Sequence, residues 1–231
     1  MYNRASWNFD GVVAEEFESH VRQNLPFYDE LQAMAVSLSD YFVSDNSLIY
    51  DIGCGTAETI KRLIERHPTK KLQCIGVDPS TEMLEKAKEK TAHLNNVQFI
   101  PAQIESVDFV HNTPLIYSIL TMHFLPLTIR QEVFKKVYDA LLPGGAFILV
   151  DKVYASDAFV QHAFTHLQYE DKLSAGFNAS EILLKETALR GVLQPLKLTE
   201  LESLLTKIGF HHEIFFKHWQ FTAILAVKPL M

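Results

Sequence analysis

Two glycines and two aspartates in the first third of the chain have the types and spacing to bind a polar ligand. The segment at residues 48–55 reads LIYDIGCG, an apolar run that ends in a glycine turn. Glycine at positions 53 and 55 leaves no Cβ atom to keep a ligand from the backbone, and a helix that starts behind the turn presents unsatisfied N–H donors. The pattern predicts close contact between this turn and a polar ligand.

Asp78 makes the interpretation more specific, because a glycine turn alone is also typical of an ordinary tight turn. A second apolar run ends in GVDP at residues 76–79, about one βα unit after Asp51. In a βαβ unit an acid at this place lies beside the ribose hydroxyls of a bound nucleotide. The turn and the acid together predict a site for a nucleoside-containing cofactor.

The glycine pattern differs from that of nicotinamide dinucleotide sites. Those sites have a third glycine where the helix packs closely, and a carboxylate just before the turn is unfavourable for a pyrophosphate. This chain has Ala57 after the turn and Asp51 before it. Asp51 suits a ligand that carries a cationic amino-acid group.

Alternating apolar and amphipathic stretches predict the elements that position these residues. Near-continuous apolar runs indicate five parallel strands, buried on both faces, at residues 47–51, 72–77, 97–100, 115–120 and 146–151. Helices are expected between them at 57–66, 80–92 and 129–141, and after them at 199–208. With a terminal hairpin at 213–219 and 222–227, the prediction is a doubly wound, Rossmann-like α/β fold with seven mostly parallel strands and an antiparallel end.

The composition is that of a globular chain able to bury one large core, since 48% of its 231 residues are hydrophobic. We expect a single domain over residues 1–231, with a helical cover at 1–45 and a helical insertion at 155–195 that contains helices at 155–172 and 180–193. The formal charge of −7 argues against a broad basic face for nucleic acid. The chain has no membrane-length apolar run and no signal-peptide core, and Cys54 and Cys74 predict buried thiols, so we expect a cytoplasmic protein.

The order Asp-x-Gly-x-Gly at 51–55, an acid after the second strand and LLPGG at 141–145 resembles the class I S-adenosylmethionine-dependent methyltransferase superfamily. The resemblance implies that the turn contacts the methionine part of S-adenosylmethionine, that one acid holds its ammonium group, and that residues after strands two and three contact ribose and adenine. The residues concerned are Gly53, Cys54, Gly55, Asp51, Asp78, Pro79, Gln103 and Ile104. From the residues alone, Asp51 as a helix cap, Gln103 as a solvated side chain and Ile104 as a core residue remain open.

The chain also resembles the carboxy-S-adenosylmethionine synthase family, whose members modify the cofactor with prephenate. The similar stretches are residues 9–28, 120–125, 142–145 and 176–185. This resemblance implies a homodimer and places Tyr28 and Ile119 at the cofactor. Three positions depart from the family: Gly55 replaces a serine, Ile119 an asparagine, and Glu186 the arginine that holds the added carboxylate.

The departure at Glu186 favours methyl transfer over cofactor modification. Two like charges about 4 Å apart repel by about 1 kcal/mol in water and by several times more in a desolvated pocket. Arg190, one helical turn further on, is the alternative partner for a carboxylate or for Glu186. We therefore expect a methyltransferase that acts on a small-molecule acceptor, with a prephenate-using synthase and a noncatalytic S-adenosylmethionine-binding module as alternatives.

His123 is the candidate general base, because it follows the fourth strand at the edge where ligands of open α/β sheets bind. Tyr154 is its competitor, and a packed histidine is the plain alternative. His162 and His166 have helical spacing but no accompanying HExxH or cysteine pattern, so we expect no metal site. Most aromatic side chains of the last third are expected in the core, and the others in an acceptor pocket or a subunit contact: Phe159, Phe164, Tyr169, Phe177, Phe215, Phe216, Trp219 and Phe221.

Overall fold

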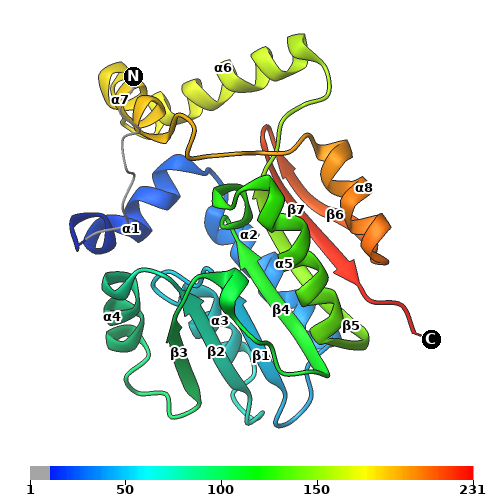
Figure 1. Cartoon of the computed structure of the whole chain (residues 1–231). Coiled ribbons are helices and arrows are strands. Elements are labelled where there is room, and N and C mark those ends of the chain that lie inside the picture. Colours follow the sequence, from blue (N-terminus) through cyan, green and yellow to red (C-terminus); the bar gives the residue numbers. More distant parts are fainter. Residues whose placement is uncertain (1–10, 231) are drawn as a thin grey trace.

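The computed structural model describes the chain from residue 11 to residue 230 (Figure 1). The first ten residues of the predicted 1–45 cover, Phe9 and Asp10 among them, lie outside the described residues. Up to residue 45 the chain forms α1 (Gly11–Asn24), α2 (Tyr28–Ser37) and the short 3-10 turn η1 (Leu38–Tyr41).

A seven-stranded sheet in the order β3-β2-β1-β4-β5-β7-β6 forms the centre of the molecule. Strands β1 to β5 are parallel, and β7 runs antiparallel to both β5 and β6, which confirms the predicted topology. The strands are β1 (Leu48–Ile52), β2 (Gln73–Asp78), β3 (Val97–Pro101), β4 (Thr113–Ile119), β5 (Leu141–Lys152), β6 (His211–His218) and β7 (Phe221–Val227).

Strand β5 begins earlier than the predicted residue 146. Thr113 pairs with Leu141, and the register of β4 against β5 shifts before Leu115 pairs with Ala146. The segment 143–145, which lies between the predicted helix at 129–141 and the predicted strand at 146–151, is therefore part of the strand. Gly145 fits this irregular stretch because a Cβ atom there would lie 2.9 Å from the carbonyl oxygen of Leu142.

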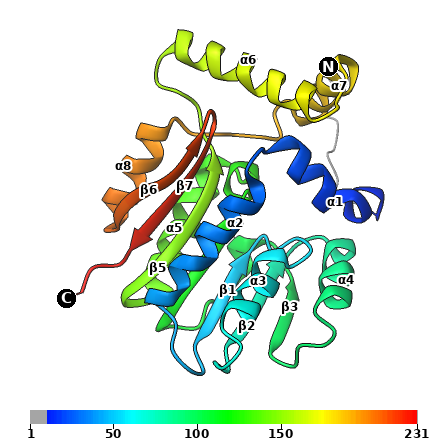
Figure 2. The same ribbon diagram turned by 180° about the vertical axis from the view of Figure 1, so that it is seen from behind.

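Helices cover both faces of the sheet, as a doubly wound fold requires (Figures 1 and 2). Apolar side chains of α2, α3 (Glu58–Arg66) and α4 (Thr81–Lys90) pack on one face. Those of α5 (Leu127–Ala140) and α8 (Leu198–Ile208) pack on the other. Ser80 starts α4 by accepting a hydrogen bond from the backbone N–H of Met83.

A third group of helices lies at the carboxyl end of the parallel strands (Figure 1). It consists of α1, α6 (Ala158–Ser174) and α7 (Ala179–Leu189), and α6 contacts both α1 and α7. The predicted insertion at 155–195 contains α6 and α7. Its position over the sheet edge places α1, α6 and α7 above the ends of the strands, where the candidate site residues are.

The prediction that most aromatic side chains of the last third belong to the core is wrong. Of those eight side chains only Phe221 is buried, and Phe159 is 78% exposed. Three of the eight, Phe159, Phe164 and Tyr169, lie on α6, which is placed beyond the sheet edge and not on a sheet face. Amphipathic periodicity reports that a helix has an apolar face and does not report what covers it.

Candidate functional site

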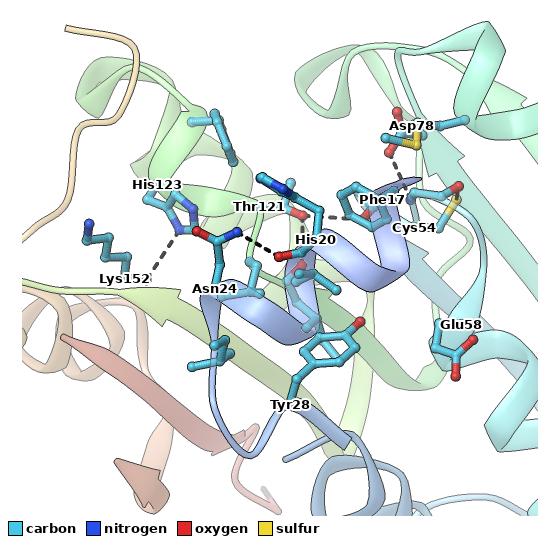
Figure 3. A pocket seen from close by; sticks show the side chains of 18 of the residues that line it. Phe17, His20, Asn24, Tyr28, Cys54, Glu58, Asp78, Thr121, His123 and Lys152 are labelled. Atoms are coloured by element: carbon cyan, nitrogen blue, oxygen red, sulfur yellow. Dashed lines mark hydrogen bonds between the residues drawn. The ribbon is translucent and has the colours of Figure 1, made fainter. Parts of the chain in front are cut away.

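A cavity of about 320 Å³ opens at the carboxyl ends of β1, β2 and β4, beneath α1. The structure brings to it every residue that the sequence placed at the cofactor, together with the candidate base. These residues are Tyr28, Asp51, Gly53, Cys54, Gly55, Asp78, Pro79, Gln103, Ile104, Ile119 and His123. Helix α1 adds Phe17, His20 and Asn24, which the sequence did not single out (Figure 3).

The glycine turn has a backbone conformation that glycine adopts far more readily than other residues. Gly53 has φ of 74° and Gly55 has φ of 52°, both in the left-handed region that favours glycine. A Cβ atom on Gly53 would lie 2.1 Å from Oγ1 of Thr121, so the residues that follow β4 close over the turn. The backbone N–H groups of Gly53 and Cys54 donate to the carbonyl of Val77 at 2.7 and 3.0 Å. The turn is thus fixed on one side by β2 and on the other by Thr121.

Asp78 links the end of β2 to this turn. Its Oδ2 accepts the backbone N–H of Gly55 at 2.9 Å, and its Oδ1 accepts the backbone N–H of Ser80 at 2.9 Å. Burial raises the pKa of Asp78, and these two hydrogen bonds oppose the shift. The carboxylate lies in the cavity where the sequence predicts contact with a ribose, and that contact stays a prediction.

Asp51 is buried beside Asp78 and carries an unsatisfied oxygen. The residue is only 2% exposed, and its Oδ2 has no hydrogen-bond partner within the described part of the chain. Burial, followed by the charge of Asp78, raises the pKa of Asp51 to about 7. The alternative role as a helix cap is wrong, since Ala57 is the N-cap of α3. A buried carboxylate without a partner is stabilised when a cationic ligand binds beside it.

The predicted adenine end is formed by the segment after β3. Gln103 is exposed and precedes the 3-10 turn η2 (Ile104–Ser106), and its side chain makes no capping hydrogen bond there. Ile104 is 3% exposed and both lines the cavity and belongs to the core. The two interpretations of Ile104 therefore hold together, because one side of the residue packs inward and another faces the cavity.

His123 is paired with a buried carboxylate that the sequence analysis missed. Its Nδ1 lies 2.5 Å from Oδ1 of Asp151, and its backbone N–H donates to the same oxygen at 3.0 Å. Asp151 is fully buried at the end of β5, and its Oδ2 has no partner among residues 17–230. The backbone N–H of Lys152 also points at Nδ1, from 3.2 Å, and would favour the opposite tautomer. The closer, charged oxygen of Asp151 favours the tautomer that carries the proton on Nδ1, which leaves Nε2 as the proton acceptor.

The competitor Tyr154 lies outside the cavity. It is 42% exposed and pairs through its backbone with Lys197. The signal for Asp151 was its place at the carboxyl end of β5, a central strand that neighbours β4, since Ile119 pairs with Val150. Residues that follow paired parallel strands meet at one edge.

Comparison with known proteins agrees with this geometry. Residues 49–145 match a methyltransferase domain family. The carboxy-S-adenosyl-L-methionine synthase of Methylococcus capsulatus is 34% identical over 96% of this chain and 93% of its own length, and that of Staphylococcus epidermidis is 36% identical over 98% and 99%. The chain belongs to the carboxy-S-adenosyl-L-methionine synthase family. It is an enzyme that uses S-adenosylmethionine, within the S-adenosylmethionine-dependent methyltransferase fold.

Solved structures support the fold at low sequence identity. YcgJ from Bacillus subtilis superimposes with a TM-score of 0.63 at 17% identity, over 86% of this chain and all of that one. An S-adenosylmethionine-dependent methyltransferase from Aquifex aeolicus gives 0.63 at 14% identity, over 96% and 100%. No helix among residues 11–230 is long and apolar enough to cross a membrane.

The residues of this family member fit S-adenosylmethionine. The unpartnered Oδ2 of Asp51 provides an acceptor for the ammonium group, and the glycine turn admits the amino-acid part against the backbone. Asp78 lies next to the turn for the ribose.

The family resemblance suggested that Glu186 lies at the cofactor. In the structure Glu186 is not among the residues that line the cavity. Glu186 is exposed on α7, and its Oε1 accepts a hydrogen bond from Tyr169 Oη at 2.5 Å. Arg190 ends α7 and is exposed, and no ion pair joins it to Glu186 in the described structure. Direct repulsion between Glu186 and a cofactor carboxylate is therefore not supported by the geometry. The departure from the family at this position still stands, because no arginine is among the described residues that line the cavity.

Three lysines line the cavity instead, from elements far apart in the sequence. They are Lys152 at the end of β5, Lys172 on α6 and Lys185 on α7. Burial lowers the pKa of Lys152 to about 8 and that of Lys185 to about 7. The sequence analysis missed this cluster because only the packing of α6 and α7 over the sheet edge brings the three residues together.

Proposed function

We propose that this enzyme transfers the methyl group of S-adenosylmethionine to a small-molecule acceptor, with His123 as general base. The supporting observation is the pair formed by His123 and Asp151 at the cavity that holds the predicted cofactor residues. S-adenosylmethionine supplies a methyl group on a sulfonium, which is already a good leaving group. The protein then needs to orient the acceptor and to remove its proton.

In this proposal each residue has a defined task. The glycine turn and Asp51 hold the amino-acid part of the cofactor, and Asp78 holds the ribose. Nε2 of His123 takes the proton from an acceptor hydroxyl or amine as the bond from that atom to the methyl carbon forms and the bond from methyl carbon to sulfur breaks. Asp151 keeps the imidazole in the required tautomer and stabilises the imidazolium that results.

A synthase that carboxylates the cofactor with prephenate is the second candidate. The names of relatives matched over nearly the whole chain favour it. The lack of an arginine among the described residues of the cavity counts against it. A noncatalytic module that only binds the cofactor is less favoured, because cofactor binding alone does not require the His123–Asp151 pair.

One experiment separates the three. The protein is incubated with S-adenosylmethionine and prephenate, and the nucleoside products are identified by mass spectrometry. In parallel, methyl-labelled cofactor is offered with a panel of hydroxyl and amine acceptors. A methylated acceptor that His123→Gln fails to produce supports the proposal. Formation of the carboxylated cofactor would replace the proposal with the synthase.

We further propose that the protein is a homodimer that works in the cytoplasm on small molecules and not on nucleic acid. Exposed leucines on α7, Leu183 at 62% and Leu184 at 70%, belong to a helix that contacts α6, which carries the exposed Phe159, and this apolar area suits a second copy. The two cysteines are free and buried, which suits a reducing compartment. The acidic net charge of −7 supports the exclusion of nucleic acid.

A further inference from the structure

Arg130 on α5 is a cation held wholly inside the protein, where arginine is rare. Its exposed fraction is 0%, and it does not line the cavity. Its Nε and Nη1 are buried and have no hydrogen-bond partner among residues 17–230. Arg130 is also the fourth residue of its helix, near the end where the helix dipole disfavours a cation. These costs set Arg130 apart from an ordinary core residue, which an apolar side chain would fill better.

The hydrogen bonds of Arg130 lead to the main chain around the proposed base. Nη2 donates to the carbonyl of Leu125 at 3.0 Å and to that of Gln194 at 2.7 Å. Leu125 directly follows the 3-10 turn η3 (Met122–Phe124), which carries His123. The backbone N–H of Gln194 donates to the carbonyl of His123 at 2.8 Å. One guanidinium nitrogen therefore ties the turn that carries His123 to the segment after α7.

The tautomer of His123 depends on which of two groups bonds to its Nδ1. Oδ1 of Asp151 lies 2.5 Å from Nδ1, and the backbone N–H of Lys152 lies 3.2 Å from it (Figure 3). The carboxylate favours a proton on Nδ1, whereas the amide favours an unprotonated Nδ1. A shift of the ring, or loss of the charge on Asp151, would strengthen the amide in this competition. The useful tautomer therefore requires a fixed main chain at His123 and an ionised Asp151.

Arg130 contributes to both requirements. Its bonds to the carbonyls of Leu125 and Gln194 restrain the main chain of His123. Burial lowers the pKa of Arg130, and the charge of Asp151 opposes this shift. An attraction that stabilises the guanidinium stabilises the ionised carboxylate equally. Asp151 is fully buried, and its Oδ2 has no hydrogen-bond partner within residues 17–230, so a buried cation nearby offsets part of its cost.

We propose that Arg130 is a positioning residue for the general base and acts through His123 and Asp151 without touching either substrate. The guanidinium keeps the imidazole where Nδ1 donates to Asp151 and Nε2 accepts the proton of the methyl acceptor. This inference rests on the proposed function, because His123 is the base proposed there. Leu193, the neighbour of Gln194, lines the cavity, so the same anchor restrains part of the cavity wall.

Nitrogen-15 NMR of the histidine rings tests this role without any acceptor. The labelled protein is saturated with S-adenosylhomocysteine at about pH 9, where an ordinary imidazole is neutral. The signals that disappear in His123→Gln identify the ring. In the wild type we expect the shifts of a protonated Nδ1 and an unprotonated Nε2. Arg130→Met should give averaged shifts that report mixed tautomers, whereas Arg130→Lys, which keeps the charge and a donor, should retain the wild-type pattern.

Matched controls separate a positioning role from a general effect on the fold. Arg66→Met removes an exposed arginine that pairs with Asp40, and it should leave the shifts of His123 unchanged. The affinity for S-adenosylhomocysteine, measured by calorimetry, should stay within about twofold in every variant. Arg130→Gln, which keeps a donor without the charge, replaces Arg130→Met if the latter fails to bind the cofactor product, and mixed tautomers are again expected. A single Nδ1-protonated tautomer in the uncharged variant would overturn the inference, as would an Arg130→Lys ring as mixed as in that variant.

Kinetics provides a second readout once the acceptor panel yields a substrate. The kcat of Arg130→Met should fall about 10- to 100-fold with an unchanged KM for S-adenosylmethionine, and Arg130→Lys should recover most of the loss. An unchanged kcat, or an effect on KM alone, would contradict a role that acts through the base. If the wild type methylates no acceptor, the proposed function fails, whereas the tautomers measured by NMR still decide whether Arg130 positions His123.

Discussion

Nδ1 of His123 lies 2.5 Å from Oδ1 of Asp151, and the backbone N–H of His123 donates to the same oxygen. One carboxylate oxygen therefore holds both the ring and the main chain of the residue. The arrangement joins the end of β5 to the segment after β4, which is the edge where the cofactor residues gather. It makes His123 the group whose proton transfer is most directly testable.

We expect His123→Gln to lower kcat by about 10²- to 10⁴-fold, because the amide keeps a hydrogen-bonding group but accepts no proton. The affinity for S-adenosylhomocysteine should stay within about twofold of the wild type. Asp151→Asn should also lower kcat, through the wrong tautomer of His123. Tyr154→Phe is the control, since Tyr154 lies outside the cavity. Stopped-flow or steady-state methylation assays measure kcat for each variant. An unchanged kcat in His123→Gln would refute the role of His123 as general base.

Asp78→Ala should weaken binding of S-adenosylhomocysteine about ten- to hundredfold, which corresponds to about 1.5–3 kcal/mol. The change removes a charged acceptor for the ribose and also the partner of the Gly55 backbone N–H. Glu85→Ala on the exposed face of α4 is the matched control. Isothermal titration calorimetry gives the affinities, and an unchanged value for Asp78→Ala would refute the ribose assignment.

The pH dependence of cofactor binding should report Asp51. Its pKa is raised to about 7 in the free protein, chiefly by burial, so the carboxyl is partly protonated near neutrality. Raising the pH ionises this buried carboxyl at a cost in stability to the free protein, whereas an ammonium ligand requires the ionised form. Affinity for S-adenosylhomocysteine should therefore rise from about pH 6 to about pH 8, with proton release.

Asp51→Asn provides the check on that prediction. The amide has nearly the same shape and does not titrate, so the rise in affinity and the proton release should both disappear. Calorimetry in two buffers with different ionisation enthalpies measures the released proton directly. A wild-type affinity that is flat over this pH range would show that Asp51 does not meet the ammonium group.

Gly53→Ala should destabilise the protein by about 1–3 kcal/mol or more, because the new methyl group collides with Thr121 in a packed turn. Gly191→Ala is the matched control. Gly191 also has a left-handed φ, of 76°, but a Cβ atom added there would have no neighbouring atom within 4 Å, so this variant carries the backbone strain without the collision. Urea unfolding measures both free energies, and equal losses would mean that strain alone explains the effect at Gly53.

Sequence patterns were sufficient to predict the sheet, and they selected residues that the structure brings into one cavity. Strand periodicity, glycine spacing and the acid after β2 are local patterns, and parallel topology brings their ends together without further information. Gly53 and Asp78 were found in this way. The start of β5 was missed because a register shift between Thr113 and Leu115 is a property of two strands and not of either sequence alone.

The three lysines of the cavity could not be found by the same reasoning. Lys152, Lys172 and Lys185 lie on three different elements, β5, α6 and α7, and they share no sequence motif. Only the docking of α6 and α7 over the sheet edge gives them a common cavity. The same packing moves Glu186 away from the position that its resemblance to the family suggested, since a neighbour in sequence on a helix points to a different side.

The last prediction concerns the exposed apolar surface of α7. Leu183 and Leu184 are 62% and 70% exposed, and burial of such side chains against a second copy contributes about 25 cal/mol for each Å² removed from water. Leu184→Glu would place a charge in that contact, where burial without a partner is strongly unfavourable. We expect the wild type to scatter light as a dimer at tens of micromolar protein and Leu184→Glu to be monomeric. Leu230→Glu, at an exposed leucine near the carboxyl end of the chain, should remain dimeric. A wild type that is monomeric at these concentrations would assign α6 and α7 to a cover for the cavity within one subunit.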